Sequence, residues 1–189
     1  MDTSIRSKLG LFAATIASLV LGACASRGDG SWVDAHRAGG IGAHAQLQAR
    51  SGSSVAGRIA FREDAGRVVA RFEVSGLRPG SEHGFHVHEK GDCSAADATS
   101  AGGHFNPGNH QHGHHSLANR HAGDMPNLRA DSAGMVRGEI TLADLTVSPG
   151  PNSLIGRSVV IHRDPDDYRS QPAGNSGPRV ACGIIAASK

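Results

Sequence analysis

The histidines of this chain have the spacing needed to bind metal ions. Twelve are present among 189 residues, and the densest group lies in the segment HGFHVHEKGDC at residues 83–93. His86 and His88 alternate there in a short strand-like run, and alternate residues of an extended strand point to the same face. The two imidazoles can therefore hold one ion between them.

Further nitrogen and oxygen donors follow downstream. They are His104, His112, His121, Asp124 and His162. Imidazole nitrogen suits both Cu(II) and Zn(II). Together with the first two histidines, these donors are numerous enough for two ions, so the pattern predicts a two-metal redox site.

The elements that must position these donors are predicted to be strands. Short runs with partial alternation recur between turn signals, and no segment beyond the N-terminal stretch has an apolar repeat of 3.6 residues. We expect strands at residues 43–49, 55–61, 67–74, 82–88, 128–131, 135–140, 158–162 and 180–185. Eight short strands predict an antiparallel sandwich or barrel. Two long polar loops, residues 92–124 and 163–178, contain or adjoin the donors, so we expect both to be functional.

Composition and charge exclude several classes of partner. The chain contains 26 glycines and has a formal net charge of +2 without any basic run. Nothing in it therefore argues for binding to nucleic acid or to an anionic membrane surface. The length suits one domain with its own core once the two ends are discounted.

The N-terminus has the pattern of an export signal. Arg6 and Lys8 precede an apolar stretch, residues 9–21, that is too short to span a bilayer comfortably. The sequence Leu-Gly-Ala-Cys that ends at Cys24 resembles the lipobox of bacterial lipoproteins. This resemblance implies cleavage before Cys24 and acylation of the new N-terminus, which would bind the chain to a lipid membrane. An ordinary secretory signal with a chance cysteine is the alternative.

This pattern predicts the organisation and location of the chain. We expect residues 1–23 to be a lipoprotein signal peptide, residues 24–40 a lipidated tether and residues 41–189 the functional domain. Ala25 after the cysteine favours the outer membrane, by the rule known for enteric bacteria. The expected location is therefore the bacterial cell envelope, with the domain facing the periplasm.

Two cysteines remain once Cys24 is assigned to the anchor. Cys93 and Cys182 form an even pair in an exported protein, which favours a disulfide in an oxidising compartment. Two free thiols or thiolate metal ligands are the alternative.

Residues 41–185 resemble the copper/zinc superoxide dismutases, most closely the exported bacterial ones. Five motifs that carry the resemblance occur in the order of the family: HGFHVHEKGDC (83–93), GGHFNP (102–107), HAGD (121–124), GRSVVIH (156–162) and GNSGPRVACGII (174–185). The resemblance implies an all-β, eight-stranded Greek-key sandwich or flattened barrel, with a long metal-binding loop and a second active-site loop.

The resemblance also assigns one copper and one zinc ion per subunit. The implied copper ligands are His86, His88, His104 and His162, and the implied zinc ligands are His104, His112, His121 and Asp124. Four nitrogens satisfy the tetragonal preference of Cu(II), and three imidazoles with a carboxylate form the closed site typical of structural zinc. His104 would then bridge the two ions.

Other residues receive roles from the same resemblance. Arg179 matches the arginine beside the copper, and Cys93 with Cys182 matches the intrachain disulfide. Asp166 matches an aspartate that links a copper ligand to a zinc ligand, here His86 and His112, although neighbouring aspartates leave room for a shift of one or two positions.

The implied reaction is the dismutation of superoxide anion to dioxygen and hydrogen peroxide by alternate reduction and oxidation of the copper. In this reaction His104 would take up and return a proton, and Arg179 would attract the anion. We expect the protein to protect the cell envelope from superoxide. The faces of such a sandwich offer a surface for a homodimer, but no exposed apolar run identifies one.

Three other interpretations use the same residues. A metal buffer would need the ligands but neither Arg179 nor a bridging His104. An adhesion-type sandwich with vestigial metals would be expected to have lost a ligand. A copper-only enzyme would not need His112, His121 and Asp124. The dismutase interpretation uses all of these residues, and we therefore favour it.

Some histidines lie outside this scheme. His83 is expected to be structural, whereas His110, His114 and His115 surround His112 and are interpreted as part of a solvated loop. A weak capture site for copper or zinc is the alternative for these three. The last loop is short and lacks glutamates, so any steering of the anion must come from Arg169, Arg179, Lys90 and Arg163.

Overall fold

The computed structural model of the chain describes Met1 and residues 41–189. The predicted signal peptide, Cys24 and tether therefore lie outside the described residues. Within residues 41–189, no helix is both long and apolar enough to cross a bilayer.

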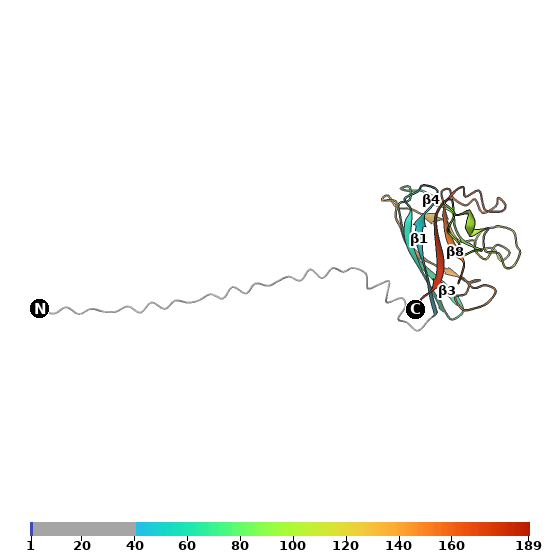
Figure 1. The fold of residues 1–189 in the computed structure, drawn as a ribbon, viewed down its shortest axis with the longest axis horizontal. Helices are drawn as coiled ribbons and strands as arrows, with labels where there is room; N and C mark the ends of the chain where they lie inside the picture. The colour runs from blue at the N-terminus through green and yellow to red at the C-terminus, as the bar shows by residue number, and fades with distance from the viewer. Residues whose placement is uncertain (2–40) are drawn as a thin grey trace.

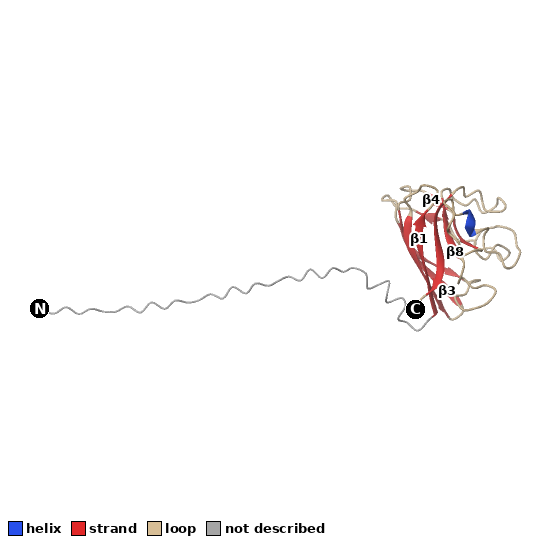
Figure 2. Ribbon diagram, in the orientation of Figure 1, coloured by secondary structure: helices blue, strands red, loops and turns tan. Residues whose placement is uncertain are grey.

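The domain consists of strands and loops with one short 3-10 helix. The strands are β1 (Ile41–Ala49), β2 (Ala56–Asp64), β3 (Arg67–Ser75), β4 (Glu82–His83), β5 (Phe85–His88), β6 (Leu128–Arg129), β7 (Val136–Leu142), β8 (Ser158–His162) and β9 (Arg179–Ala187). The helix η1 covers Thr99–Ala101. Figure 2 shows the long loops and this helix gathered on one side of the strands.

Seven strands form one curled antiparallel sheet in the order β5-β8-β9-β1-β2-β3-β7, and β4 pairs with β6 (Figure 1). Long connections return the chain to the sheet, because β1 has β9 as a neighbour and β3 has β7, which is the kind of connection found in Greek-key folds. The predicted all-β antiparallel class is confirmed.

The predicted strand at residues 82–88 is divided in two at Gly84. The Gly84 N–H donates to the carbonyl of Asp164 at 2.9 Å, and its own carbonyl accepts from the N–H of His162 at 2.8 Å. The chain thus pairs with β6 before Gly84 and with β8 after it. Nine strands result where eight were predicted.

The strands that carry candidate ligands differ in burial from the other strands of the sheet. In β3, buried Val68, Ala70, Phe72 and Val74 alternate with more exposed residues, so one face packs on the core and the other meets water. β5 and β8 are instead buried at every residue. The long loops must therefore cover the face of these strands that is turned away from the core, and that face carries the histidines.

Candidate metal centre

Three segments that are distant in sequence are joined by backbone hydrogen bonds behind the candidate ligands. The Val87 N–H donates to Gly123 at 3.0 Å, the Gly123 N–H to Phe105 at 2.9 Å, and the Phe105 N–H to Val87 at 2.8 Å. Each of these residues is next in sequence to a candidate ligand. This junction of Val87, Phe105 and Gly123 therefore brings the ligands of β5 and of the long loop to one place.

The junction has no room for a side chain at Gly123. A Cβ atom built there would lie 2.2 Å from the Val87 carbonyl oxygen and 3.1 Å from the Phe105 nitrogen. Glycine is required at this position because the backbones approach so closely.

The first ligand cluster contains the four predicted copper ligands. The ligand atoms of His86, His88, His104 and His162 lie within 4.8 Å of one another, and all four residues are buried. His86 and His88 come from β5, His162 ends β8, and His104 belongs to the long loop.

Hydrogen bonds on the far side of these rings leave one nitrogen of each free to face the others. The Nδ1–H of His88 donates to the carbonyl of Gly102 at 3.0 Å, and that of His162 to the carbonyl of Gly177 at 3.1 Å. The two Nε2 atoms of His88 and His162 then lie 3.5 Å apart. His86 Nδ1 and His104 Nε2 are buried without a hydrogen-bond partner. Buried polar atoms normally have a partner, and a cation would supply one here.

The second cluster contains the four predicted zinc ligands. A single oxygen of Asp124, Oδ1, lies 2.8 Å from His104 Nδ1, 3.0 Å from His112 Nδ1 and 3.3 Å from His121 Nδ1. Ligand atoms placed tetrahedrally about 2.0–2.1 Å from a zinc ion would be separated by about 3.3 Å. The donor types and their spacing therefore fit zinc, and the two nitrogens of His104 face the two clusters.

Burial keeps most of these imidazoles neutral. It lowers the pKa of His104 to about 4 and that of His162 to about 3, and it lowers the pKa of His88 well below its ordinary value. Neutral rings have a lone pair to offer a metal ion.

His112 is the exception among the ligands. Burial alone would lower its pKa, but hydrogen bonds to Asp124 and Asp166 outweigh burial and raise the pKa to about 9. The pKa of Asp124 is lowered because hydrogen bonds from the histidines around it outweigh its burial. Asp124 thus gives the second cluster an ionised carboxylate, which is a donor for a cation.

Asp166 connects the two clusters. Its Oδ2 accepts from His86 Nε2 at 2.8 Å, and its Oδ1 accepts from His112 Nε2 at 2.9 Å. The neighbouring Asp164 is partly exposed and pairs with Arg163, and Asp167 accepts backbone N–H groups of its own loop. The structure therefore places Asp166, rather than either neighbour, between a predicted copper ligand and a predicted zinc ligand.

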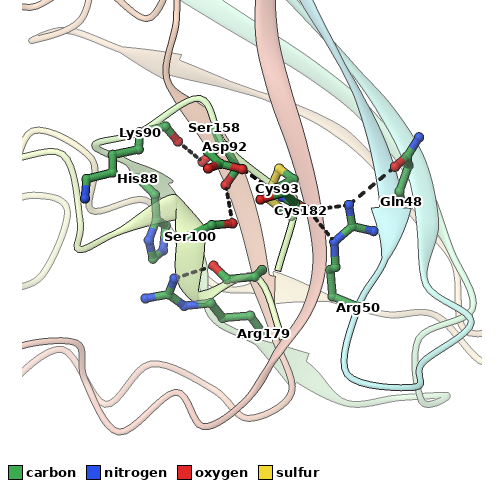
Figure 3. The surroundings of a disulfide bond; sticks show 12 residues. Gln48, Arg50, His88, Lys90, Asp92, Cys93, Ser100, Ser158, Arg179 and Cys182 are labelled. Carbon is green, nitrogen blue, oxygen red and sulfur yellow. Dashed lines mark hydrogen bonds between the residues drawn. A yellow bond between two sulfur atoms is a disulfide. The ribbon is translucent and has the colours of Figure 1, made fainter. Parts of the chain in front are cut away.

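Arg179, the first residue of β9, is fixed beside the first cluster (Figure 3). Its Nη1 donates to the carbonyl of Ala98 at 2.6 Å and its Nη2 to the carbonyl of Gly102 at 2.7 Å. Gly102 also accepts the bond from His88, so one carbonyl orients both a candidate ligand and the candidate anion-binding arginine. The positive charge of Arg179 adds to burial in lowering the pKa of His88 and His162.

The predicted disulfide between Cys93 and Cys182 is confirmed. It joins the loop that carries the Ala98 and Gly102 carbonyls to β9, three residues after Arg179 (Figure 3). Arg50 holds the same loop, because its Nε and Nη2 donate to the Cys93 carbonyl at 2.9 and 2.6 Å. The backbone that orients Arg179 is thus attached to the sheet by one covalent and two polar links.

The other histidines of residues 41–189 belong to neither cluster. His83 is buried and bonds to Ser81 and to the backbone carbonyl of His162. His114 and His115 lie next to each other with ring centroids 4.1 Å apart, and within residues 41–189 neither they nor His110 joins a group that could hold a metal.

Sequence reasoning missed two side-chain amides near the clusters. Asn127 accepts the N–H of Asp166 at 2.9 Å and donates to its carbonyl at 3.0 Å. Gln171 makes the same pair of bonds with His112, at 2.9 and 2.8 Å. Both residues bind backbone groups, which have no signature of residue type, so no signal in a single sequence marks them.

Comparisons with known proteins agree with this geometry. The profile of the family "Copper/zinc superoxide dismutase (SODC)" matches residues 55–185. Superoxide dismutase [Cu-Zn] 2 of Aquifex aeolicus is 43% identical over 147 residues, which are 76% of this chain and 85% of that protein. The superoxide dismutase-like protein YojM of Bacillus subtilis is 40% identical over 77% of this chain and 76% of its own length. The crystal structure of the clock protein EA4 superimposes with a TM-score of 0.72 at 39% identity, covering 79% of this chain and 96% of that one.

Replacing Gly123 with alanine tests the backbone junction. The added methyl group would collide with the Val87 carbonyl, so the hydrogen bonds that join the three segments must break. We expect Gly123→Ala to lower the free energy of unfolding by about 2–3 kcal/mol and to reduce both copper and zinc content in metal analysis. Gly103→Ala is the matched control, because a Cβ at Gly103 meets nothing within 4 Å. Normal content of both metals in Gly123→Ala would contradict the junction's role.

Replacing Asp166 with asparagine tests the link between the clusters. The amide can accept a bond from one ring but presents an N–H donor to the other, so one of His86 and His112 loses its orienting partner. We expect Asp166→Asn to weaken zinc binding by about 10- to 100-fold in a chelator competition. Asp64→Asn, which makes the same change at an exposed residue at the end of β2, serves as the control. Equal zinc affinity in both variants would remove Asp166 from this role.

Proposed function

Because this chain belongs to the copper/zinc superoxide dismutase family, we propose that it dismutes superoxide at the paired histidine centre and thereby protects the cell envelope. The protein is an enzyme of the superoxide dismutase class, with copper and zinc as its cofactors. We assign copper to the cluster of His86, His88, His104 and His162, and zinc to that of His104, His112, His121 and Asp124. Copper, when bound, supplies a one-electron redox couple, and zinc supplies a fixed charge that organises the long loop.

The position of His104 carries the proposal. Its Nδ1 faces Asp124 in the zinc cluster, and its Nε2 is buried in the copper cluster without a partner. A metal buffer has no use for a ring shared between two sites. An enzyme that consumes protons has such a use, because two superoxide anions and two protons give one dioxygen and one hydrogen peroxide. His104 Nε2 is placed to hold one of these protons and to deliver it to the product, while water supplies the other.

Arg179 supplies the charge that binds the substrate. Its guanidinium is held by two carbonyls beside the copper cluster, so the cation needs no rearrangement when an anion arrives. Arg163, another candidate for steering, is already paired with Asp164 at 3.1 Å. The attraction of superoxide at short range therefore rests on Arg179 more than on Arg163.

We also propose that the protein is located outside the cytoplasm. The basic residues, apolar stretch and lipobox-like sequence that end at Cys24 support export and lipid anchoring, and Ala25 supports the outer membrane. The disulfide supports an oxidising compartment. The exposed faces of the sheet also leave room for a homodimer.

Reversing the charge of Arg179 tests the mechanism. The protein beginning at residue 25, with its disulfide formed and both metals loaded, should dismute superoxide at about 10⁸–10⁹ M⁻¹s⁻¹. We expect Arg179→Glu to lower this rate by at least about tenfold and to leave the copper and zinc content unchanged. Arg129→Glu, on the short strand β6, controls for net charge.

Two outcomes would contradict this mechanism. Equal loss of metal and rate in Arg179→Glu would refute the role of Arg179. A wild-type rate no better than that of free copper would favour the metal buffer.

Replacing Cys24 with serine tests the anchor. Serine cannot carry a thioether-linked lipid, so we expect Cys24→Ser protein expressed in a Gram-negative host to leave the membrane fraction. Labelling with a radioactive fatty acid should mark the wild-type chain only. Recovery of unlabelled wild-type protein in the soluble fraction would show that the N-terminus is an ordinary secretory signal.

A further inference from the structure

The side chain of Gln171 bonds to both the backbone N–H and the backbone carbonyl of His112, a predicted zinc ligand. Its Oε1 accepts the N–H of His112 at 2.9 Å, and its Nε2 donates to the carbonyl of His112 at 2.8 Å. His112 lies in residues 105–120, a stretch that contains no helix or strand. A side-chain amide thus provides the pair of bonds that a neighbouring strand would otherwise provide.

The second active-site loop contacts His112 at two different points. Gln171 binds its backbone, and Asp166 of the same loop accepts from its Nε2 at 2.9 Å. Gly174 lies against the pair, because a Cβ there would collide with the Asp166 carboxylate and come within 2.8 Å of His112 Nε2. With its backbone and one ring nitrogen held, His112 can direct only Nδ1 toward the zinc cluster.

The loop that presents Gln171 is itself held together by hydrogen bonds. Asp167 accepts the N–H groups of Arg169 and Ser170 at 2.9 and 2.8 Å. The Gly174 N–H donates to Ser170 at 2.7 Å, and its carbonyl accepts from Asp167 at 2.9 Å. Gln171 therefore extends from a turn that is closed by hydrogen bonds within its own loop.

We propose that Gln171 is a positioning residue that fixes His112 for zinc and so slows the release of the ion. This inference rests on the zinc site of the proposed function. Its consequence is that zinc retention depends on the second active-site loop, although neither Asp166 nor Gln171, which both bond to His112, is a predicted zinc ligand. The same loop ends at Arg179, so its order matters to both halves of the centre.

The test compares zinc release from the fully loaded wild-type protein with that from Gln171→Met and Gln171→Glu. Methionine keeps the length of the side chain and forms neither bond. Glutamate keeps an acceptor for the His112 N–H but places an oxygen against the His112 carbonyl. We expect zinc transfer to a chromogenic chelator to be about 10- to 100-fold faster in both variants. Gln46→Met is the matched control, because Gln46 donates to the Gly57 carbonyl at 2.9 Å on the sheet.

A spectrum separates positioning from general loosening of the domain. Cobalt placed in the zinc site absorbs visible light according to its ligand geometry, so we expect the Gln171→Met spectrum to differ from those of wild type and Gln46→Met. Release rates equal to wild type in both Gln171 variants would overturn the inference while leaving the proposed function intact. An unchanged cobalt spectrum with faster release would also overturn it, because His112 would then be oriented without Gln171. Failure of the wild-type protein to retain zinc would instead refute the zinc site itself.

Discussion

Two buried carboxylates, Asp124 and Asp166, set the geometry of the paired centre. A carboxylate removed from water is costly unless hydrogen bonds and positive charge surround it. Asp124 is surrounded by three imidazoles and accepts the backbone N–H groups of Gly113 and His121 at 3.1 Å. Asp166 accepts from two imidazoles and from the N–H of Tyr168. The loops must close around these two groups. The same carboxylates raise the pKa of His112 to about 9, because hydrogen bonds to Asp124 and Asp166 favour the charged form of its ring and outweigh its burial.

The sheet contributes rigidity to a site that is built largely from loops. β5 places Phe85 and Val87 in the core and His86 and His88 in the centre, so the position of two ligands follows from the packing of two buried side chains. The long loop is attached to this strand by the backbone junction at Val87, and its earlier part is attached to β9 by the disulfide. The candidate metal ligands are therefore held in place by the core, although most of them belong to no regular element.

The sequence predicted much of this arrangement, for reasons that differ between residues. Alternation along a strand is a physical rule, and it placed His86 and His88 on one face correctly. The grouping of His104, His112, His121, Asp124 and His162 came from resemblance to a family, because no rule of spacing brings loop residues together. Asp166 was assigned by the same resemblance, and the coordinates show which two rings it bonds. The break at Gly84 required coordinates, because it depends on which backbones lie beside the strand. Arg50, Asn127 and Gln171 act on peptide groups, which every residue possesses, and therefore left no mark in the sequence.

The carbonyl of Gly102 has two donors, His88 Nδ1 and Arg179 Nη2, and this sharing limits how the enzyme can change. The backbone at Gly102 has a φ of +75°, and a side chain there would collide with Glu89. A displacement of this one oxygen would alter both the electron-donating strength of a proposed copper ligand and the position of the cation proposed to bind the substrate. Under the proposed function, a change at Gly102 would therefore affect the reduction potential and the capture of the anion together. Independent adjustment of either property would require substitutions elsewhere.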